Sequence, residues 1–331
     1  MIDKKIVNIE RFLLDSQPES ARGDLTAILY DLALGAKIIA AQTRRAGLLD
    51  VLGFTDHINV QGEQQRKLDA FADNVITRLI LDKKHCCALV SEEQADIIYA
   101  STEAKDGSYI LFFDPLDGSS NTDANISIGT IFGVYKRIDP DHPIDQRDCL
   151  QPGKNLVAAG YILYGTSTML VYSAGHGVHG FTLDPLLGEF ILSHENIRFG
   201  DPPKYFSFNV ALLDQSSEGL NRYLGWLKTE QDPPLTHRYV GSMVADFHRN
   251  LIHGGVFGYP AAESKPDGKI RLLYEAAPLA FIAEHAGGYG SDGTQSLLEI
   301  LPNNIHQRVP VFIGNRTLVE KIESILSLNI N

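Results

Sequence analysis

Acidic residues directly follow two of the apolar runs in this sequence. Residues 109–113 form one continuous apolar run, and Asp114 and Asp117 stand three residues apart just after it. A second apolar run is followed by another acid pair, Glu92 and Glu93. Carboxylates at neighbouring strand ends repel one another strongly unless cations lie between them. Because hard cations prefer oxygen ligands, the pattern indicates a site for Mg²⁺ or Mn²⁺.

The residues around Asp117 also have the properties of an anion site. Gly118 permits close approach of the backbone, and Ser119 and Ser120 supply N–H and O–H donors. Pro115 stiffens the expected turn, so that the two aspartates converge. A plain turn is the alternative interpretation, since Asp-Pro and Asp-Gly are common turn dipeptides. Cations beside a phosphate cradle suit hydrolysis of a phosphate monoester, because the metal neutralises the phosphate and acidifies bound water.

Three further acids extend this group. Glu63 and Asp69 bracket a polar loop and the helix expected after it, and Glu275 follows an apolar stretch. Activation of water needs a carboxylate base beyond the metal ligands, and the sequence has more acids than two metals require. Taken singly, Glu63 and Asp69 are typical of solvated surface acids, and Glu275 of a helix-start acid.

The expected elements place these acids in a layered α/β protein. Apolar spacing predicts a helix over 24–45, and another helix follows a polar, mobile loop at 55–65. Continuous apolar runs predict strands buried on both faces. Strands are expected at 86–90, 109–113, 126–135, 156–164, 168–173, 178–183, 189–192, 255–259 and 309–313, and further helices at 214–228, 242–253, 276–286 and 316–327. Glycine and proline at 200–203 predict a boundary between sub-domains 1–199 and 200–331.

Composition excludes several classes of protein. At about 150 residues per domain, the 331 residues favour two domains, and 44% hydrophobic residues argue against global disorder. A net charge of −12 argues against a nucleic-acid binder. No apolar run approaches the roughly 18 residues of a membrane span, and the first residues do not resemble a signal peptide. Cys86 and Cys87 lie in an apolar run and are predicted to be buried, and the three cysteines cannot make a disulfide framework, which favours a cytoplasmic protein.

Several segments together resemble the class I fructose-1,6-bisphosphatases, within the Mg²⁺-dependent, Li⁺-sensitive sugar and inositol phosphatases. The resemblance covers nearly the whole chain and is carried by residues 89–93, 113–121, 129–133, 151–161, 238–246, 269–275 and 305–308. It implies a layered α/β/α/β/α sandwich and a homotetramer. It also implies hydrolysis of the 1-phosphate of fructose 1,6-bisphosphate, in gluconeogenesis or Calvin-type sugar metabolism.

The resemblance also implies roles for single residues. Two or more Mg²⁺ ions, with Mn²⁺ or Zn²⁺ as alternatives, would be bound by Glu92, Glu93, Asp114, the Leu116 carbonyl, Asp117 and Glu275. Asp69, assisted by Glu93, would activate water, and Glu63 occupies a loop position where the family usually has Asp. The substrate would contact Asp117, Gly118, Ser119, Ser120, Asn209, Tyr239, Gly241, Ser242, Met243, Tyr259, Lys269 and Arg271, together with Arg238 from a neighbouring subunit.

Departures from the family pattern affect two sites. Leu212 stands where the family usually has a tyrosine that contacts the 6-phosphate. Many members of the family bind AMP as an inhibitor near their first helix. The residues of this chain that resemble that site are Gly23, Asp24, Leu25, Thr26, Tyr109 and Lys136. Lys136 replaces the usual arginine and Ser108 the usual lysine, and an Arg-to-Lys change loses the bidentate phosphate fork. The sequence therefore predicts weak or absent inhibition by AMP.

Two alternatives remain open at this stage. The first is sedoheptulose 1,7-bisphosphatase, or an enzyme acting on both sugars, because these substrates differ away from the metal site. The second is a non-catalytic sugar-phosphate sensor. A sensor should have lost at least one metal acid, whereas all of them are present here.

Overall fold

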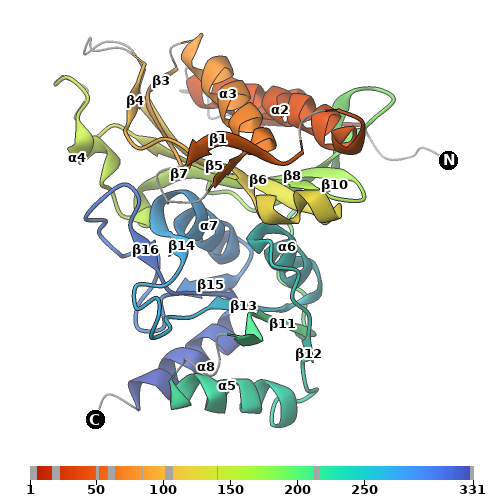
Figure 1. Cartoon of the computed structure of the whole chain (residues 1–331), viewed down its shortest axis with the longest axis vertical. Helices are drawn as coiled ribbons and strands as arrows, with labels where there is room; N and C mark the ends of the chain where they lie inside the picture. The colour runs from red at the N-terminus through yellow and green to blue at the C-terminus, as the bar shows by residue number, and fades with distance from the viewer. Residues whose placement is uncertain are drawn as a thin grey trace.

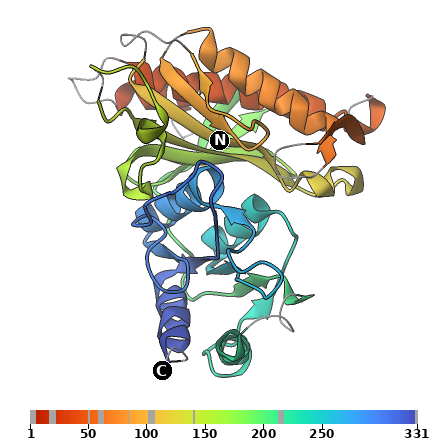
Figure 2. The same cartoon turned by 60° about the vertical axis from the view of Figure 1, so that its left-hand side comes forward.

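Five layers, in the order helix–sheet–helix–sheet–helix, make up the described part of the chain (Figure 1). The computed structural model describes residues 6–16, 23–49, 52–58, 64–83, 85–100, 107–139, 141–211 and 217–328. Figure 2 shows the same layers from another side, with the segments after residue 200 forming the lower half. The expected layered α/β sandwich is confirmed.

The larger sheet has eight strands in the order β10-β9-β8-β7-β6-β5-β3-β4. Its strands are β3 (Cys86–Ser91), β4 (Ile98–Tyr99), β5 (Tyr109–Asp117), β6 (Ile128–Lys136), β7 (Leu156–Tyr164), β8 (Thr168–Ser173), β9 (His179–Asp184) and β10 (Glu189–His194). β3 and β5 are parallel, whereas the other pairs in this sheet are antiparallel. The two acid-terminated runs are therefore adjacent strands that end at the same edge.

Three helices cover the outer face of this sheet: α1 (Ile9–Asp15), α2 (Asp24–Thr43) and α3 (Lys67–Leu81). Their apolar stripes, including Ile28, Leu32 and Ile76, pack with the sheet in one continuous core. The predicted loop at 55–65 differs in its described part, where β1 (Phe54–Ile58) and β2 (Gln64–Arg66) pair as antiparallel strands.

The smaller sheet has five strands in the order β12-β11-β13-β17-β15. They are β11 (Tyr205–Phe208), β12 (Thr236–His237), β13 (Gly255–Tyr259), β15 (Gly288–Ser291) and β17 (Val311–Asn315). Helices α6 (Met243–His253) and α7 (Ala277–His285) lie between the sheets, and α5 (Glu218–Thr229) and α8 (Arg316–Ser327) cover the outer face. The largest core joins both sheets to the central helices, which explains why almost every α7 side chain is apolar and buried.

The remaining short elements are α4 (Gln146–Cys149), β14 (Ile270–Arg271), β16 (Arg308–Val309), three 3₁₀ turns (Ala46–Leu48, Ser119–Ala124, Gly153–Asn155) and a π-helical turn (Leu272–Ala276). Cys86 and Cys87 are buried, as predicted, Cys149 is buried as well, and all three are free. Among the described residues, no helix is both long and apolar enough to cross a membrane.

Candidate active site

A β-bulge at the end of β5 brings Asp114 and Asp117 to the same side of the sheet. The register with β6 shifts between them, because Asp114 faces Ile131 whereas Asp117 faces Gly129. In a regular strand, side chains three residues apart point to opposite faces, and one extra residue corrects this. The expected turn at Pro115 is thus replaced by a continuing strand, and bulges are among the few strand positions that accept proline.

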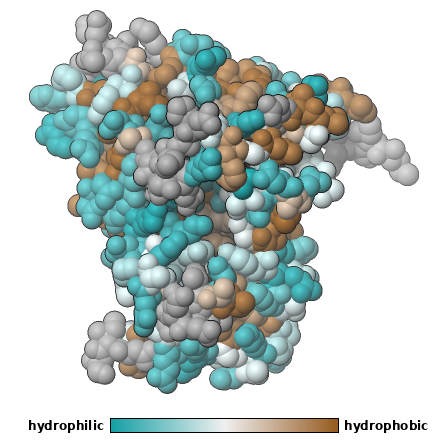
Figure 3. Space-filling view, viewed as in Figure 1, coloured by the Kyte–Doolittle hydropathy of each residue, from teal (hydrophilic) through white to brown (hydrophobic). Residues whose placement is uncertain are grey.

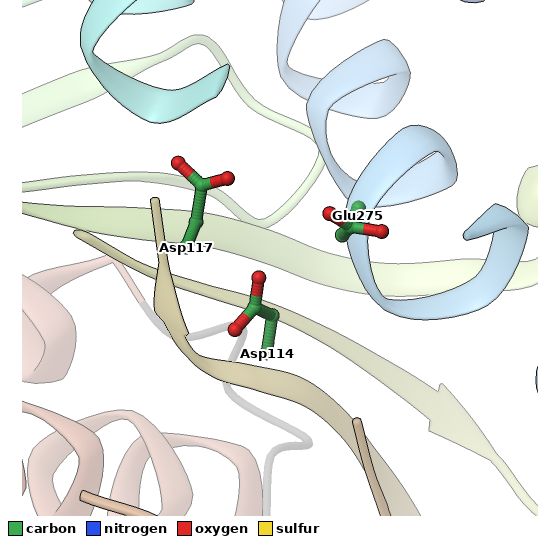
Figure 4. Close-up of side chains that lie close together, drawn as sticks. All are labelled: Asp114, Asp117 and Glu275. Carbon is green, nitrogen blue, oxygen red and sulfur yellow. The ribbon is translucent and has the colours of Figure 1, made fainter. Parts of the chain in front are cut away.

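Glu275 completes a group of three buried carboxylates with these aspartates. Each residue offers one oxygen, and the three oxygens lie within 4.8 Å of one another. Figure 4 shows Asp114 and Asp117 rising from β5 toward Glu275 on the facing helix. Glu275 belongs to the π-helical turn before α7, and its Oε2 accepts the Arg271 backbone N–H at 2.6 Å. Such turns are frequent at functional sites.

Burial disfavours negative charge on all three carboxylates. It raises the pKa of Asp117 to about 6 and that of Glu275 to about 7. The pKa of Asp114 lies well above its usual range, through burial and then through the nearby charges of Glu92 and Glu275. Three acids gathered in this way are costly to ionise unless a cation lies between them, so the site has the charge and the ligands that a divalent metal needs.

Arg271 and Glu92 form a buried ion pair at the edge of this cluster. Arg271 Nη2 lies 2.5 Å from Glu92 Oε1, and Nη1 lies 3.7 Å from Glu275 Oε2. The pKa of Glu92 is nevertheless raised, because the effect of burial exceeds that of the guanidinium. Arg271 therefore balances part of the negative charge and fixes the position of two carboxylates.

Asp69 lies in the first turn of α3, beside the acid pair that follows β3. Its Oδ1 is buried and accepts no hydrogen bond from the described residues. Burial first, and then the charge of Glu93, raise the pKa of Asp69 to about 8. Glu93 Oε2 accepts a hydrogen bond from Gln65 Nε2 at 2.6 Å. The structure thus places Asp69 on the same cavity as the cluster, whereas Glu63 lies outside the described residues.

Gly118 and the first turn of α6 hold the end of β5. The φ of Gly118 is +74°, and a Cβ there would lie 2.6 Å from Ser242 Cβ. Ser242 Oγ donates to Asp117 Oδ2 at 2.8 Å, and the Val244 N–H donates to the same oxygen at 2.9 Å. Ser242 is fully buried, so its hydroxyl orients a carboxylate rather than lining the cavity. Ser119 and Ser120 follow in the next turn and face the cavity.

A cavity of about 480 Å³ connects the cluster to the smaller sheet. Of the predicted substrate residues, Tyr239, Gly241, Met243, Tyr259 and Lys269 also line this cavity. Lys269 Nζ lies 5.9 Å from the centroid of the Tyr259 ring. The cavity therefore combines a cluster of acids, which can hold cations, with a lysine beside a tyrosine, and both features suit a substrate with anionic groups.

Besides Ser242, two further predicted substrate residues do not line this cavity. Arg238 is exposed and its Nη1 donates to the His237 carbonyl. Asn209 is half-buried, and its Oδ1 accepts the Ala211 N–H at 3.1 Å. Leu212 lies outside the described residues.

Family models for fructose-1,6-bisphosphatase match most of the chain. The N-terminal domain model matches residues 7–195 and the C-terminal domain model residues 200–327. The chain belongs to the fructose-1,6-bisphosphatase family. The resemblance read from the sequence is confirmed, and with it the enzyme class, a phosphoric monoester hydrolase of carbohydrate metabolism. Enzymes of this family depend on metal ions and act on a sugar bisphosphate.

Relatives are similar over almost their full length. The class 1 fructose-1,6-bisphosphatase of Chloroherpeton thalassium is 48% identical, with 96% of this chain and 93% of the relative covered. That of Maridesulfovibrio salexigens is also 48% identical, with 98% and 99% covered. The holo form of Leishmania major fructose-1,6-bisphosphatase superposes with a TM-score of 0.92 at 37% identity, covering 98% of this chain and all of the other.

Several residues that line the cavity were not predicted from the sequence. Phe54, Gln64 and Arg66 come from the β1–β2 hairpin and line the cavity. The Arg66 guanidinium lies 4.7 Å from the Phe54 ring centroid and 2.6 Å from Asp123 in the 3₁₀ turn. These residues fall in and beside the segment predicted as a loop, and its polar composition carried no signal for a paired strand.

The region that resembles an AMP site lies at the other end of β5. Gly23, with a φ of +84°, precedes Asp24, Leu25 and Thr26 at the start of α2. Tyr109 and Lys136 face each other across β5 and β6. Burial, followed by the charge of Asp24, raises the pKa of Tyr109, which shows that the helix start lies close to this strand pair.

Proposed function

We propose that the chain hydrolyses the 1-phosphate of fructose 1,6-bisphosphate to give fructose 6-phosphate and phosphate. The observation that carries this proposal is the convergence of Asp114, Asp117 and Glu275, whose oxygens lie within 4.8 Å of one another, in a cavity that Lys269 also lines. The acids suit a metal-assisted reaction at one phosphate, and the lysine suits recognition of a second.

The proposed metal ligands are oxygen donors that face one cavity. Besides the three clustered carboxylates, Glu92, Glu93 and Leu116 line it, and carboxylate and carbonyl oxygens suit Mg²⁺ or Mn²⁺, with Zn²⁺ as a further possibility. Five carboxylates exceed the needs of one ion, which supports two or more. When bound, the ions neutralise the phosphate, acidify bound water and stabilise the leaving oxygen.

The side chains supply the proton transfer and the orientation. Asp69 Oδ1 accepts the proton of the attacking water, because it is a buried carboxylate oxygen that accepts no hydrogen bond from the described residues. Glu93 assists Asp69, and Glu63 is proposed as a second acid of the same step. Ser119 and Ser120 donate to the 1-phosphate, and Gly118 lets the backbone approach it.

The 6-phosphate is proposed to bind at the far side of the cavity. Lys269 supplies the charge, Tyr239 and Tyr259 supply hydroxyls, and Gly241 and Met243 line the sugar, with Asn209 as a further contact. Arg238 is exposed and is proposed to reach the cavity of a neighbouring subunit in a homotetramer. Exposed apolar side chains such as Leu48 (85% exposed) and Leu186 (94%) support self-association, and Figure 3 shows apolar residues gathered over α2 and α3.

Three wider expectations remain part of the proposal. The chain divides at residues 199 and 200 into a metal-binding half and a substrate-binding half. The start of α2, with Tyr109 and Lys136, is a degenerate AMP site. The buried, free cysteines support a cytoplasmic protein.

Phosphate release as a function of Mg²⁺ concentration tests the function. We expect Mg²⁺-dependent release from fructose 1,6-bisphosphate, lowered by at least about 10³-fold in Asp117→Ala, since a metal supplies several kcal/mol. Glu275→Gln, which keeps the shape of the side chain, provides a second variant. Asp15→Ala is the control, because Asp15 is an exposed acid in a surface pair. Unchanged release in both site variants would contradict the metal-assisted mechanism, and binding without release would favour a sensor.

A further inference from the structure

Two charged side chains of α6 hold the backbone of residues 238–241. Asp246 and Arg249 lie three residues apart, so they project from the same side of the helix. The segment 238–241 runs from β12 to the start of α6, and its members Tyr239 and Gly241 line the cavity.

The contacts engage three peptide groups of this segment. Both carboxylate oxygens of Asp246 lie 3.0 Å from the Val240 nitrogen, and Oδ2 lies 3.0 Å from the Gly241 nitrogen. Arg249 Nη2 donates to the Arg238 carbonyl at 2.9 Å and lies 2.5 Å from Asp246 Oδ1. Asp246 therefore binds backbone N–H groups of the segment, and Arg249 binds one of its backbone carbonyls.

Burying the carboxylate of Asp246 is an unfavourable way to hold a segment that has only a structural role. Asp246 is completely buried, and burying a carboxylate is unfavourable unless its oxygens are well paired. Arg249 Nη2 also contacts Ser207 Oγ at 2.7 Å, which connects the pair to β11. Gly241 has a φ of +85°. Because glycine adopts positive and negative φ about equally, contacts from neighbouring side chains are needed to hold this one conformation.

The same helix also orients the metal end of the cavity. Ser242 and Val244 at its start donate to Asp117, and Asp246 in the same first turn accepts from Val240 and Gly241. One helix thus positions both a carboxylate of the cluster and the segment 238–241. A substrate with two phosphates must fit both of these parts at once, whereas one with a single phosphate need not.

We propose that Asp246 and Arg249 are positioning residues that hold the wall of the cavity for the distal phosphate and so select bisphosphate over monophosphate substrates. This inference rests on the proposed function, which assigns Tyr239 to the distal phosphate and Gly241 to the sugar. Neither side chain lines the cavity, so both act through the backbone of residues 238–241.

The test compares fructose 1,6-bisphosphate with fructose 1-phosphate, which lacks the distal phosphate. For Asp246→Asn we expect a KM for the bisphosphate raised about tenfold, with a change in kcat below about threefold. The kcat/KM for fructose 1-phosphate should change by less than about threefold, so the ratio of the two substrates falls. Calorimetry measures binding independently of catalysis, and it should show a Kd for fructose 6-phosphate that is raised by a similar factor.

Variants of Arg249 and a distant aspartate serve as controls. Arg249→Met should act like Asp246→Asn, whereas Arg249→Lys keeps the charge and one donor and should have a smaller effect. Asp31→Asn is the matched control, since Asp31 is also buried and its Oδ1 lies 2.8 Å from Lys83 Nζ, on the opposite side of the larger sheet. It should lower the melting temperature without changing the substrate ratio.

The results of these measurements separate a failure of the positioning role from a failure of the proposed function. Equal losses on both substrates in Asp246→Asn, or an unchanged KM and Kd, would overturn the positioning role. An Asp31→Asn enzyme with the same fall in ratio would reduce the effect to general stability, which also overturns it. Failure of the parent enzyme to hydrolyse fructose 1,6-bisphosphate would instead contradict the proposed function itself.

Discussion

The Ser242 hydroxyl donates to Asp117 Oδ2 at 2.8 Å and so joins the start of α6 to the end of β5 across 125 residues of sequence. The Val244 N–H donates to the same oxygen at 2.9 Å. Hydrogen bonds of this kind orient a metal ligand and limit the geometries that it can adopt.

Ser242→Ala is therefore expected to weaken metal binding. Loss of one orienting hydrogen bond should raise the Mg²⁺ concentration for half-maximal phosphate release by about tenfold or more. Ser291→Ala is the control, because Ser291 is equally buried in β15 but its hydroxyl contacts the Glu323 carboxylate and the Gln295 carbonyl. A Mg²⁺ requirement that stays the same in Ser242→Ala would show that this hydrogen bond does not orient Asp117.

Gly118 is expected to tolerate no side chain. Gly118→Ala and Gly175→Ala both force alanine into a left-handed conformation, at about 1–2 kcal/mol each. Only Gly118→Ala also brings a Cβ to 2.6 Å from Ser242, since nothing lies within 4 Å at Gly175. Denaturant unfolding should show a larger loss for Gly118→Ala, accompanied by lost activity. Equal losses of stability and full activity in both variants would contradict the close approach.

The metal-free chain is expected to lose stability as the pH rises. Burial raises the folded-state pKa of Asp69 to about 8, of Glu275 to about 7 and of Asp117 to about 6. Their ordinary values lie near about 4, so these groups hold protons more tightly when folded. Their stabilising contribution is complete below about pH 4 and is lost as the pH rises through the folded values.

Melting curves of the metal-free chain measure this loss. The melting temperature should fall by at least about 5 °C between about pH 5 and about pH 8. Added Mg²⁺ should restore more stability at the higher pH, because the ligands must be deprotonated to bind it. A melting temperature that is flat or rises over this interval, with chelator present, would show that the clustered acids are not destabilised by burial.

Inhibition by AMP is expected to be weak or absent. Lys136 faces Tyr109 across β5 and β6, and lysine offers a phosphate one point charge instead of a bidentate fork. Lys136→Arg should therefore lower the AMP concentration for half-maximal inhibition. Inhibition of the parent enzyme at low AMP with ordinary cooperativity would contradict this prediction.

Regular elements with strong periodicity could be predicted from the sequence. The strand at 255–259 and the helix at 316–327 agree with β13 and α8, because each pattern is bounded by glycine or by a polar cap. Acids after two continuous apolar runs correctly placed two carboxylate pairs at one edge of a sheet, since β3 and β5 are parallel neighbours.

The local geometry of the site could not be predicted in this way. Pro115 suggested a turn, whereas pairing with β6 continues β5 through a bulge, and only the partner strand reveals the extra residue. The roles of Ser242 and Asp246 depend on contacts between elements that are distant in sequence. The spacing of residues along the sequence does not reveal such contacts. Ser242 was expected to contact the substrate, and in the structure its hydroxyl donates to Asp117.

The most direct test of the account is steady-state phosphate release from fructose 1,6-bisphosphate, measured beside sedoheptulose 1,7-bisphosphate with Mg²⁺ and with chelator. The account predicts release that requires Mg²⁺, fructose 6-phosphate as the sugar product, and a higher kcat/KM for the fructose substrate. Release that persists in chelator, or a higher kcat/KM for the sedoheptulose substrate, would contradict it.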